Sequence, residues 1–76
     1  MTPVQIDTLC ILRCCGPCSA NEVWLRLERG RDVVYATLDQ LYLMGLATRT
    51  RMIPHVWDVS ERGRQVFAGL AREAVH

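Results

Sequence analysis

The sequence predicts one mainly α-helical domain with a small β-hairpin, spanning residues 1–76. Two observations lead to this fold class. Helix start and stop signals divide most of the chain into four helical segments. Between the third and fourth segments, the hydrophobic pattern changes from a helical period to the alternation of a strand. Half of the residues are hydrophobic, so a chain of this length can form the core of a single small domain.

The first helix is expected to run from Pro3 to about Cys15. Thr2 precedes it as an N-cap, the proline occupies the first helical position, and Gln5 completes a capping box. Gly16-Pro17 ends the helix, because glycine accepts the backbone conformation at a helix end and proline cannot continue a helix.

The second helix is expected to begin after Ser19. Ser19 and Glu22 form a further capping box of the S-x-x-E type. The helix then runs to about Glu28, and Gly30 ends it. Only a few residues around this glycine separate the second helix from the third, so the two helices are joined by a short turn.

The third helix is expected over about residues 32–44, with Asp32 as its N-cap and Gly45 after its end. Apolar side chains recur at helical spacing along one side of it. These side chains predict its buried face: Val34, Leu38 and Leu41.

A β-hairpin is expected over about residues 46–59. Its first strand covers Leu46 to Met52, with Arg49 and Arg51 at alternate positions, Ile53-Pro54 marks the turn, and His55 to Val59 forms the returning strand. Ser60 then caps the fourth helix. One side of that helix carries the apolar residues Val66, Phe67 and Leu70.

Two helices joined by a short turn form a helix-turn-helix, and a β-hairpin directly after them is a wing. The predicted fold is therefore a winged helix-turn-helix with a three-helix core, a hairpin wing and a C-terminal helix. The segments "GPCSANEVWLRLERGRDVVYATLDQLYLMGLATR" and "HVWDVSERGRQVF" resemble prokaryotic regulators of the PadR, MarR and ArsR types over about residues 9–68, in a short form. The matching residues are Gly16-Pro17, Ser19, Glu22, Val34-Tyr35, Leu38, Leu41, Gly45-Leu46, Trp57, Val59-Ser60 and Gly63-Arg64.

The resemblance implies a sequence-specific regulator of transcription, of the repressor type, that binds double-stranded DNA. In such proteins the third helix enters the major groove, and the wing lies along phosphates or in the minor groove. Arg31 suits a phosphate or guanine, Gln40 an adenine, and Ala36 or Thr37 a thymine methyl group. The expected DNA-contacting residues are Arg31, Val33, Ala36, Thr37, Gln40, Arg49 and Arg51.

A protein-binding winged helix is the alternative, because this fold also serves as an interaction module. Asp32 and Asp39 flank the third helix and would oppose phosphates, and the formal net charge is only +1. A short, stand-alone protein of this kind suits a phage or a mobile element, where it would bind and inhibit a host protein. The residues expected in such a contact are Trp24, Leu25, Met52 and Ile53.

A homodimer is expected from the first helix. This helix has a second apolar side, which must be covered by the fourth helix or by a second subunit. A domain this small has little surface of its own to offer, and the resembling families usually dimerise through their terminal helices. The residues expected at the interface are Ile6, Leu9, Cys10 and Arg13.

The four cysteines crowd into nine residues, Cys10, Cys14, Cys15 and Cys18. "CGPC" is the thioredoxin motif, but here it follows a helix rather than a strand, so redox catalysis is not expected. Cys15 is expected in the core, and Cys18 is expected to pack against Val23 beside the helix start. A metal- or thiol-sensing regulator is a lesser alternative in which Cys18 would be the reactive thiol. We expect no bound metal and no cofactor.

Other classes of protein are not indicated. No apolar run approaches the roughly 20 residues of a membrane span, and the N-terminus lacks the layout of a signal peptide. Clustered free thiols fit a reducing compartment, so a cytoplasmic location is expected. No constellation of base, nucleophile and oxyanion donor is visible, so the chain is not expected to be an enzyme.

Overall fold

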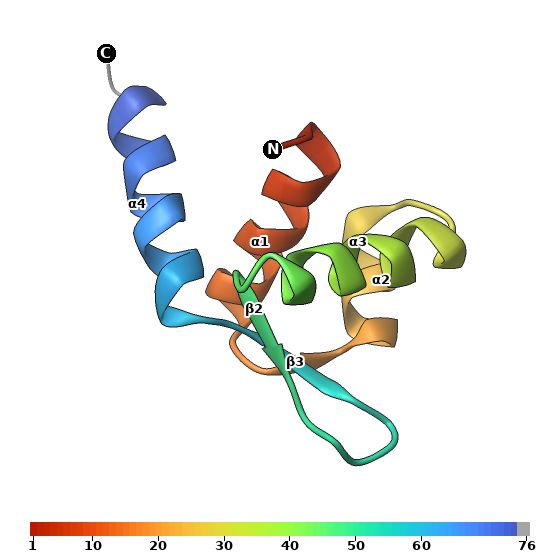
Figure 1. The fold of residues 1–76 in the computed structure, drawn as a ribbon. Coiled ribbons are helices and arrows are strands. Elements are labelled where there is room, and N and C mark those ends of the chain that lie inside the picture. Colours follow the sequence, from red (N-terminus) through yellow and green to blue (C-terminus); the bar gives the residue numbers. More distant parts are fainter. Residues whose placement is uncertain (75–76) are drawn as a thin grey trace.

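The structure, a computed structural model, describes residues 1–74, with side chains as far as residue 70. Figure 1 shows the helices and the two wing strands in the predicted order. The described elements are α1 (Pro3–Cys15), β1 (Cys18–Ser19), α2 (Ala20–Leu27), α3 (Arg31–Leu43), β2 (Ala47–Arg49), β3 (Val56–Val59) and α4 (Glu61–Ala74). The predicted winged helix-turn-helix is confirmed.

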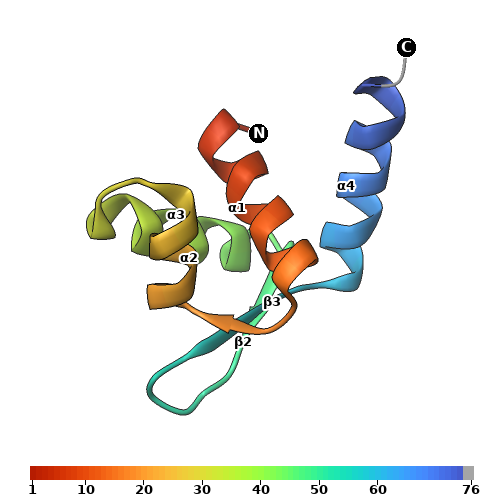
Figure 2. The same ribbon diagram turned by 180° about the vertical axis from the view of Figure 1, so that it is seen from behind.

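Three helices pack around one core, and a small sheet closes one end of it. α1, α2 and α3 all contact one another, and the sheet has the antiparallel strand order β1-β3-β2. The β2–β3 hairpin projects away from the helices as the wing (Figure 1). In Figures 1 and 2, α1 lies between the α2–α3 pair and α4. The helix-turn-helix and the wing are therefore next to each other, and α4 lies on the far side of α1.

The central strand β3 connects the sheet to the core. Trp57 pairs with Cys18 of β1 on one side and with Arg49 of β2 on the other, and its side chain is only 2% exposed. The apolar core joins all three helices to this strand. Its buried members are Leu9, Leu12, Cys18, Ala20, Val23, Val34, Leu38, Leu41, Leu46, Ala47, Trp57 and Val59.

The predicted cap of α1 is confirmed in full. The Thr2 hydroxyl accepts a hydrogen bond from the Gln5 backbone N–H at 3.3 Å, and the Gln5 side chain accepts one from the Thr2 N–H at 3.0 Å. Gly16 follows the helix with a φ of 73°, in the region that favours glycine. These local signals placed both ends of the helix correctly.

The turn between α2 and α3 differs from the prediction. Ser19 caps α2 as expected, accepting a hydrogen bond from the Glu22 N–H at 3.2 Å. However, Glu28 takes the left-handed conformation that ends α2, with a φ of 58°, and Gly30 is instead the N-cap of α3. The prediction of Asp32 as N-cap was wrong, because the helix has already started at Arg31. Asp32 lies in the first turn, where a carboxylate still favours the positive end of the helix.

The strands of the wing are shorter than predicted. β2 ends at Arg49 and β3 begins at Val56. Thr50 closes the loop between them, because its N–H donates to the Val56 carbonyl at 3.0 Å and its hydroxyl accepts from the Val56 N–H at 2.9 Å. Pro54 lies within this loop and has no N–H to add to the ladder. Strand β1 was not predicted, because two residues are too few to show a period.

The start of α4 agrees with the prediction that Ser60 caps it. The Ser60 hydroxyl accepts a hydrogen bond from the Gly63 N–H at 3.0 Å and donates one to the Gly45 carbonyl at 2.6 Å. The same side chain thus joins the start of α4 to the turn after α3. Among the described helices, none is both long enough and apolar enough to span a bilayer.

Candidate nucleic-acid interface

Helix α3 has one face in the core and one face toward solvent. Val34, Leu38 and Leu41 are buried, as predicted. On the outer side Val33 is 38% and Tyr35 is 51% exposed, and Ala36 is exposed as well. These outward residues follow one another along the first two turns of the helix, so this face is open to a partner.

Thr37 does not belong to the outward face. It is 3% exposed, and its hydroxyl donates to the Val33 carbonyl at 2.7 Å. The expectation that Thr37 meets DNA was wrong, because this bond satisfies the hydroxyl within the helix and lets threonine replace an apolar core residue.

Two further expected contact residues lie at opposite sides of α3. Gln40 is exposed and accepts a hydrogen bond from the Gln5 side chain at 3.0 Å, so it lies on the side toward α1. Arg31 lies on the side toward α2. Its guanidinium stacks 4.3 Å from the centre of the Trp24 ring and is 3.5 Å from the Asn21 side-chain oxygen.

The wing carries the two expected arginines in different settings. The Arg49 Nη1 lies 3.3 Å from Asp39 Oδ1 of α3, and the guanidinium stacks 4.4 Å from the centre of the Tyr42 ring. The centre of the Trp57 ring lies 5.7 Å from the same guanidinium. Arg51 is exposed in the loop between the strands. Arg49 therefore joins the wing to α3, whereas Arg51 faces solvent.

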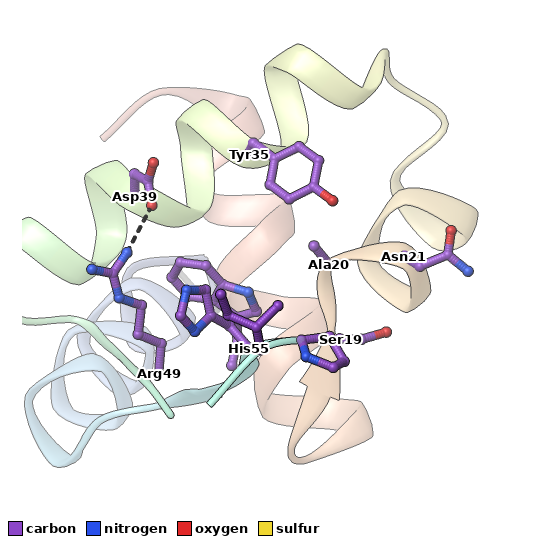
Figure 3. A pocket seen from close by; sticks show the side chains of 10 residues that line it. Ser19, Ala20, Asn21, Tyr35, Asp39, Arg49 and His55 are labelled. Carbon is purple, nitrogen blue, oxygen red and sulfur yellow. Dashed lines mark hydrogen bonds and ion pairs between the residues drawn. The ribbon is translucent and has the colours of Figure 1, made fainter. Parts of the chain in front are cut away.

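A cleft of about 570 Å³ separates the wing from the helix-turn-helix (Figure 3). The start of α2, the outer side of α3 and the wing each form one wall of it. The Asp39–Arg49 ion pair crosses one end, and Tyr35 stands over the other. The lining residues are Ser19, Ala20, Asn21, Tyr35, Asp39, Arg49, Ile53, Pro54, His55 and Trp57.

The charge on this side of the molecule is small, because two aspartates oppose three arginines. Asp32 and Asp39 both lie on the exposed side of α3. Asp39 is compensated by Arg49, while Arg31 and Arg51 add positive charge at the two ends of the surface. The surface can thus approach a polyanion through its arginines, but its general attraction to phosphates is weak.

The expected dimer residues are divided between core and surface. Leu9 is fully buried in the core of the single chain, so the expectation that it lies at a subunit interface was wrong. Arg13 stacks 4.6 Å from the centre of the Phe67 ring of α4, and Ile6 and Cys10 are half-buried. Part of the second side of α1 is therefore covered by α4.

The expected protein-contact residues are mostly exposed. Leu25 is 62%, Met52 79% and Ile53 88% exposed. Trp24 is half-buried, packs against the core and is stacked by Arg31. The apolar surface of this set therefore lies mainly at the wing tip.

The cysteines do not share one environment. Cys18 is buried in the core together with Val23, and burial raises the pKa of its thiol to about 11. Cys15 is exposed, so its predicted core position was wrong: the buried side of α1 is formed by Thr8, Leu9 and Leu12.

The Cys10 and Cys14 thiols lie 3.9 Å apart on α1. Burial, followed by the neighbouring Cys14 thiol, raises the pKa of Cys10. Within the described part of the chain, no three His, Cys, Asp or Glu side chains are grouped to hold a metal ion.

Several residues of this surface were not predicted as part of it. Tyr35 was noted only as a residue that matches the resembling families, but it is half exposed over the cleft. Asp39 was considered only as a charge that opposes phosphates, and His55 only as the start of the returning strand of the hairpin. The spacing of Tyr35 and Asp39, four residues apart on a helix, is the signal that could have placed them on one side.

Comparison with solved structures confirms the fold. BpsR from Bordetella bronchiseptica, whose DNA binding is regulated by 6-hydroxynicotinic acid, superposes with a TM-score of 0.90 at 22% identity, over 97% of this chain and 55% of its own. A MarR-family protein from Bacillus stearothermophilus superposes with a TM-score of 0.87 at 19% identity, over 96% of this chain and 53% of its own. A MarR-family transcriptional regulator from Streptomyces coelicolor superposes with a TM-score of 0.85 at 22% identity, over 95% of this chain and 53% of its own.

The chain thus spans about half the length of these regulators and has their winged-helix fold. No protein-family model and no curated protein sequence matches it significantly.

Proposed function

We propose that the chain is a sequence-specific, double-stranded DNA-binding regulator of transcription that acts as a repressor in the cytoplasm. The observation that carries the proposal is the position of the wing beside the exposed face of α3. In this arrangement α3 fits the major groove while the hairpin reaches the neighbouring backbone. The fold shared with MarR-family regulators supports a binding role rather than a catalytic one.

The contacts follow from how each side chain lies. Ala36 and Val33 are open to base edges and thymine methyl groups, and Arg31 reaches a phosphate or a guanine at the start of α3. Arg51 contacts the backbone from the wing. Arg49 is paired with Asp39, so its contact with the DNA backbone competes with this ion pair. Gln40 reads a base only after leaving its hydrogen bond with Gln5.

A homodimer on a two-fold site is part of the proposal. Its interface would use the half-buried Ile6 and Cys10 of α1, beside the Arg13–Phe67 contact with α4. Two copies of α3 related by a two-fold axis would read two half-sites, so the bound sequence would be palindromic.

The test is selection of binding sequences from random double-stranded DNA at two salt concentrations. The proposal predicts a two-fold motif, bound by wild type and weakened by Arg51→Ala and Arg31→Ala. Arg64→Ala is the matched control, because Arg64 is an exposed arginine of α4 paired with Glu61 at 3.7 Å. Recovery of no motif by a folded protein overturns the proposal.

The exposed wing tip favours a second candidate function. Met52 and Ile53 present apolar side chains where a basic tip would suit DNA better, so a protein partner would use this surface. Met52→Ser with Ile53→Ser would abolish capture of such a partner. If the DNA-binding function is correct, the same variant would still bind the selected DNA.

A further inference from the structure

His55 forms part of the floor of the cleft between the wing and the helix-turn-helix, at the base of the wing loop. It is half-buried, and its ring meets the Trp57 ring edge-on, with 6.0 Å between the ring centres and 79° between the planes. The imidazole is thus held in one orientation within the surface that faces DNA in the proposed function.

One nitrogen of this imidazole is already committed. His55 Nδ1 lies 2.7 Å from the Thr50 backbone oxygen. Because a carbonyl only accepts hydrogen bonds, Nδ1 carries a hydrogen and donates it whether the ring is neutral or charged. Any change in protonation therefore takes place at Nε2, which is an acceptor in the neutral ring and a donor in the charged one.

The charges around His55 make that change decisive for the cleft. Asp39 of α3 and Arg49 of β2 line the cleft as an ion pair and cancel each other. Tyr35 is the remaining titratable side chain of the lining. The formal charge of the lining is accordingly zero with a neutral His55 and +1 with a protonated one.

The remaining polar groups suit an anionic ligand. Ser19 and Asn21 lie at the start of α2, whose positive end favours a negative charge, and Tyr35 brings a hydroxyl from α3. When α3 occupies the major groove and a wing follows the adjacent backbone, the strand between the two grooves passes between helix and wing. The cleft lies at that position.

We propose that this cleft holds a phosphate group of the DNA backbone, to which Nε2–H of protonated His55 donates a hydrogen bond. The inference rests on the proposed DNA-binding function and adds a pH-dependent contact to it. Protonation would supply one additional phosphate contact, so binding tightens as the pH falls and the imidazole gains a proton.

The test is the affinity for a selected DNA site at pH 6.0 and pH 8.0, measured by fluorescence anisotropy over a series of salt concentrations. Wild type is expected to bind about tenfold more tightly at pH 6.0, as for one charge-assisted hydrogen bond. The slope of log affinity against log salt should become steeper by about 0.9, the value for one additional phosphate contact.

Two variants separate His55 from other titrating groups. His55→Asn keeps an N–H near the Nδ1 position, and so the bond to Thr50, but removes Nε2; it should match wild type at pH 8.0 and lose the gain at pH 6.0. His55→Gln places a permanent neutral donor near Nε2 and should bind with a smaller, pH-independent gain. The second histidine, His76, and the α-amino group remain in both variants. Their contribution to the pH dependence of binding is therefore the same as in wild type and cancels in the comparison.

A pH gain that survives in folded His55→Asn overturns this inference and leaves the proposed function intact. Equal affinity of wild type for its site at both pH values would likewise overturn this inference and leave the proposed function intact. Failure to bind any DNA at either pH overturns the proposed function itself.

Discussion

Arg49 of the wing is paired with Asp39 of helix α3, with Nη1 and Oδ1 3.3 Å apart. The guanidinium is also stacked against the Tyr42 ring of α3. The Arg49 side chain therefore joins the wing to the helix that would read DNA. The pair has two opposite effects: it fixes the wing, and it neutralises one positive charge on the surface that faces DNA in the proposed function.

Asp39→Asn should therefore increase binding to non-specific DNA. The substitution removes a negative charge and releases Arg49 to a phosphate, so affinity at low salt should rise roughly three- to tenfold, with a steeper salt dependence. The side chains are 35% and 57% exposed, so the stability change should stay below about 1 kcal/mol. Anisotropy with random-sequence DNA and urea denaturation measure the two quantities.

The control for this substitution is Glu61→Gln, which breaks the exposed Arg64–Glu61 pair of α4 and should leave DNA affinity unchanged. A loss of affinity in Asp39→Asn would contradict the expected competition, because it would mean that the pair acts mainly by holding the wing in place.

Gly63 and Gly69 of α4 should respond in opposite directions to alanine. A Cβ at Gly63 would overlap the Leu46 carbonyl oxygen and lie 2.8 Å from a Val59 methyl group, whereas a Cβ at Gly69 meets nothing within 4 Å. Gly63→Ala should lower the free energy of unfolding by about 3 kcal/mol or more, because the clash is with backbone. Gly69→Ala should raise it by about 0.5–1 kcal/mol.

Urea denaturation followed by circular dichroism compares the two glycine variants directly. Equal stability of the two would show that α4 does not pack on the turn after α3 as described.

Burial of Cys18 should make stability fall at alkaline pH. Its pKa is raised from 9.0 to about 11 in the folded chain. Between these values the unfolded chain loses the thiol proton while the folded chain keeps it, so the free energy of unfolding decreases as pH rises from about 9 to 11. Equilibrium denaturation at pH 8, 9, 10 and 11 tests this, and Cys18→Ala should show a shallower decline.

Thiol labelling provides a second measurement. At pH 8 a water-soluble disulfide reagent should modify the exposed Cys14 and Cys15 well before Cys18. Rapid labelling of Cys18 in the folded protein would contradict its place in the core.

The sequence predicted the elements that local chemistry determines. Thr2, Ser19 and Ser60 mark helix starts because each side chain caps a backbone N–H within three residues. The inward face of α3 was predicted from the spacing of its large apolar residues alone. The order of helices and wing, and with it the fold, followed from these signals.

Features that depend on tertiary contacts were missed or misplaced. Strand β1 exists only through its pairing with β3, and Cys15 is exposed because the buried side of α1 is set by its neighbours rather than by its own apolar pattern. Thr37 lies on the buried side of α3, and its hydroxyl is satisfied there by a bond within the helix. The Asp39–Arg49 pair and the position of His55 depend on how the wing folds back toward α3.

Ala36 and Thr37 are adjacent in α3, but Ala36 is exposed and Thr37 is buried, and this difference provides a direct test of DNA reading by α3. Ala36→Gln should change the sequence selected from random double-stranded DNA, enriching adenine at one position in each half-site, because glutamine pairs with adenine in the major groove. Thr37→Val should leave the selected motif unchanged and alter stability by about 1 kcal/mol. If Ala36→Gln instead selects the wild-type motif with wild-type affinity, α3 does not read the groove.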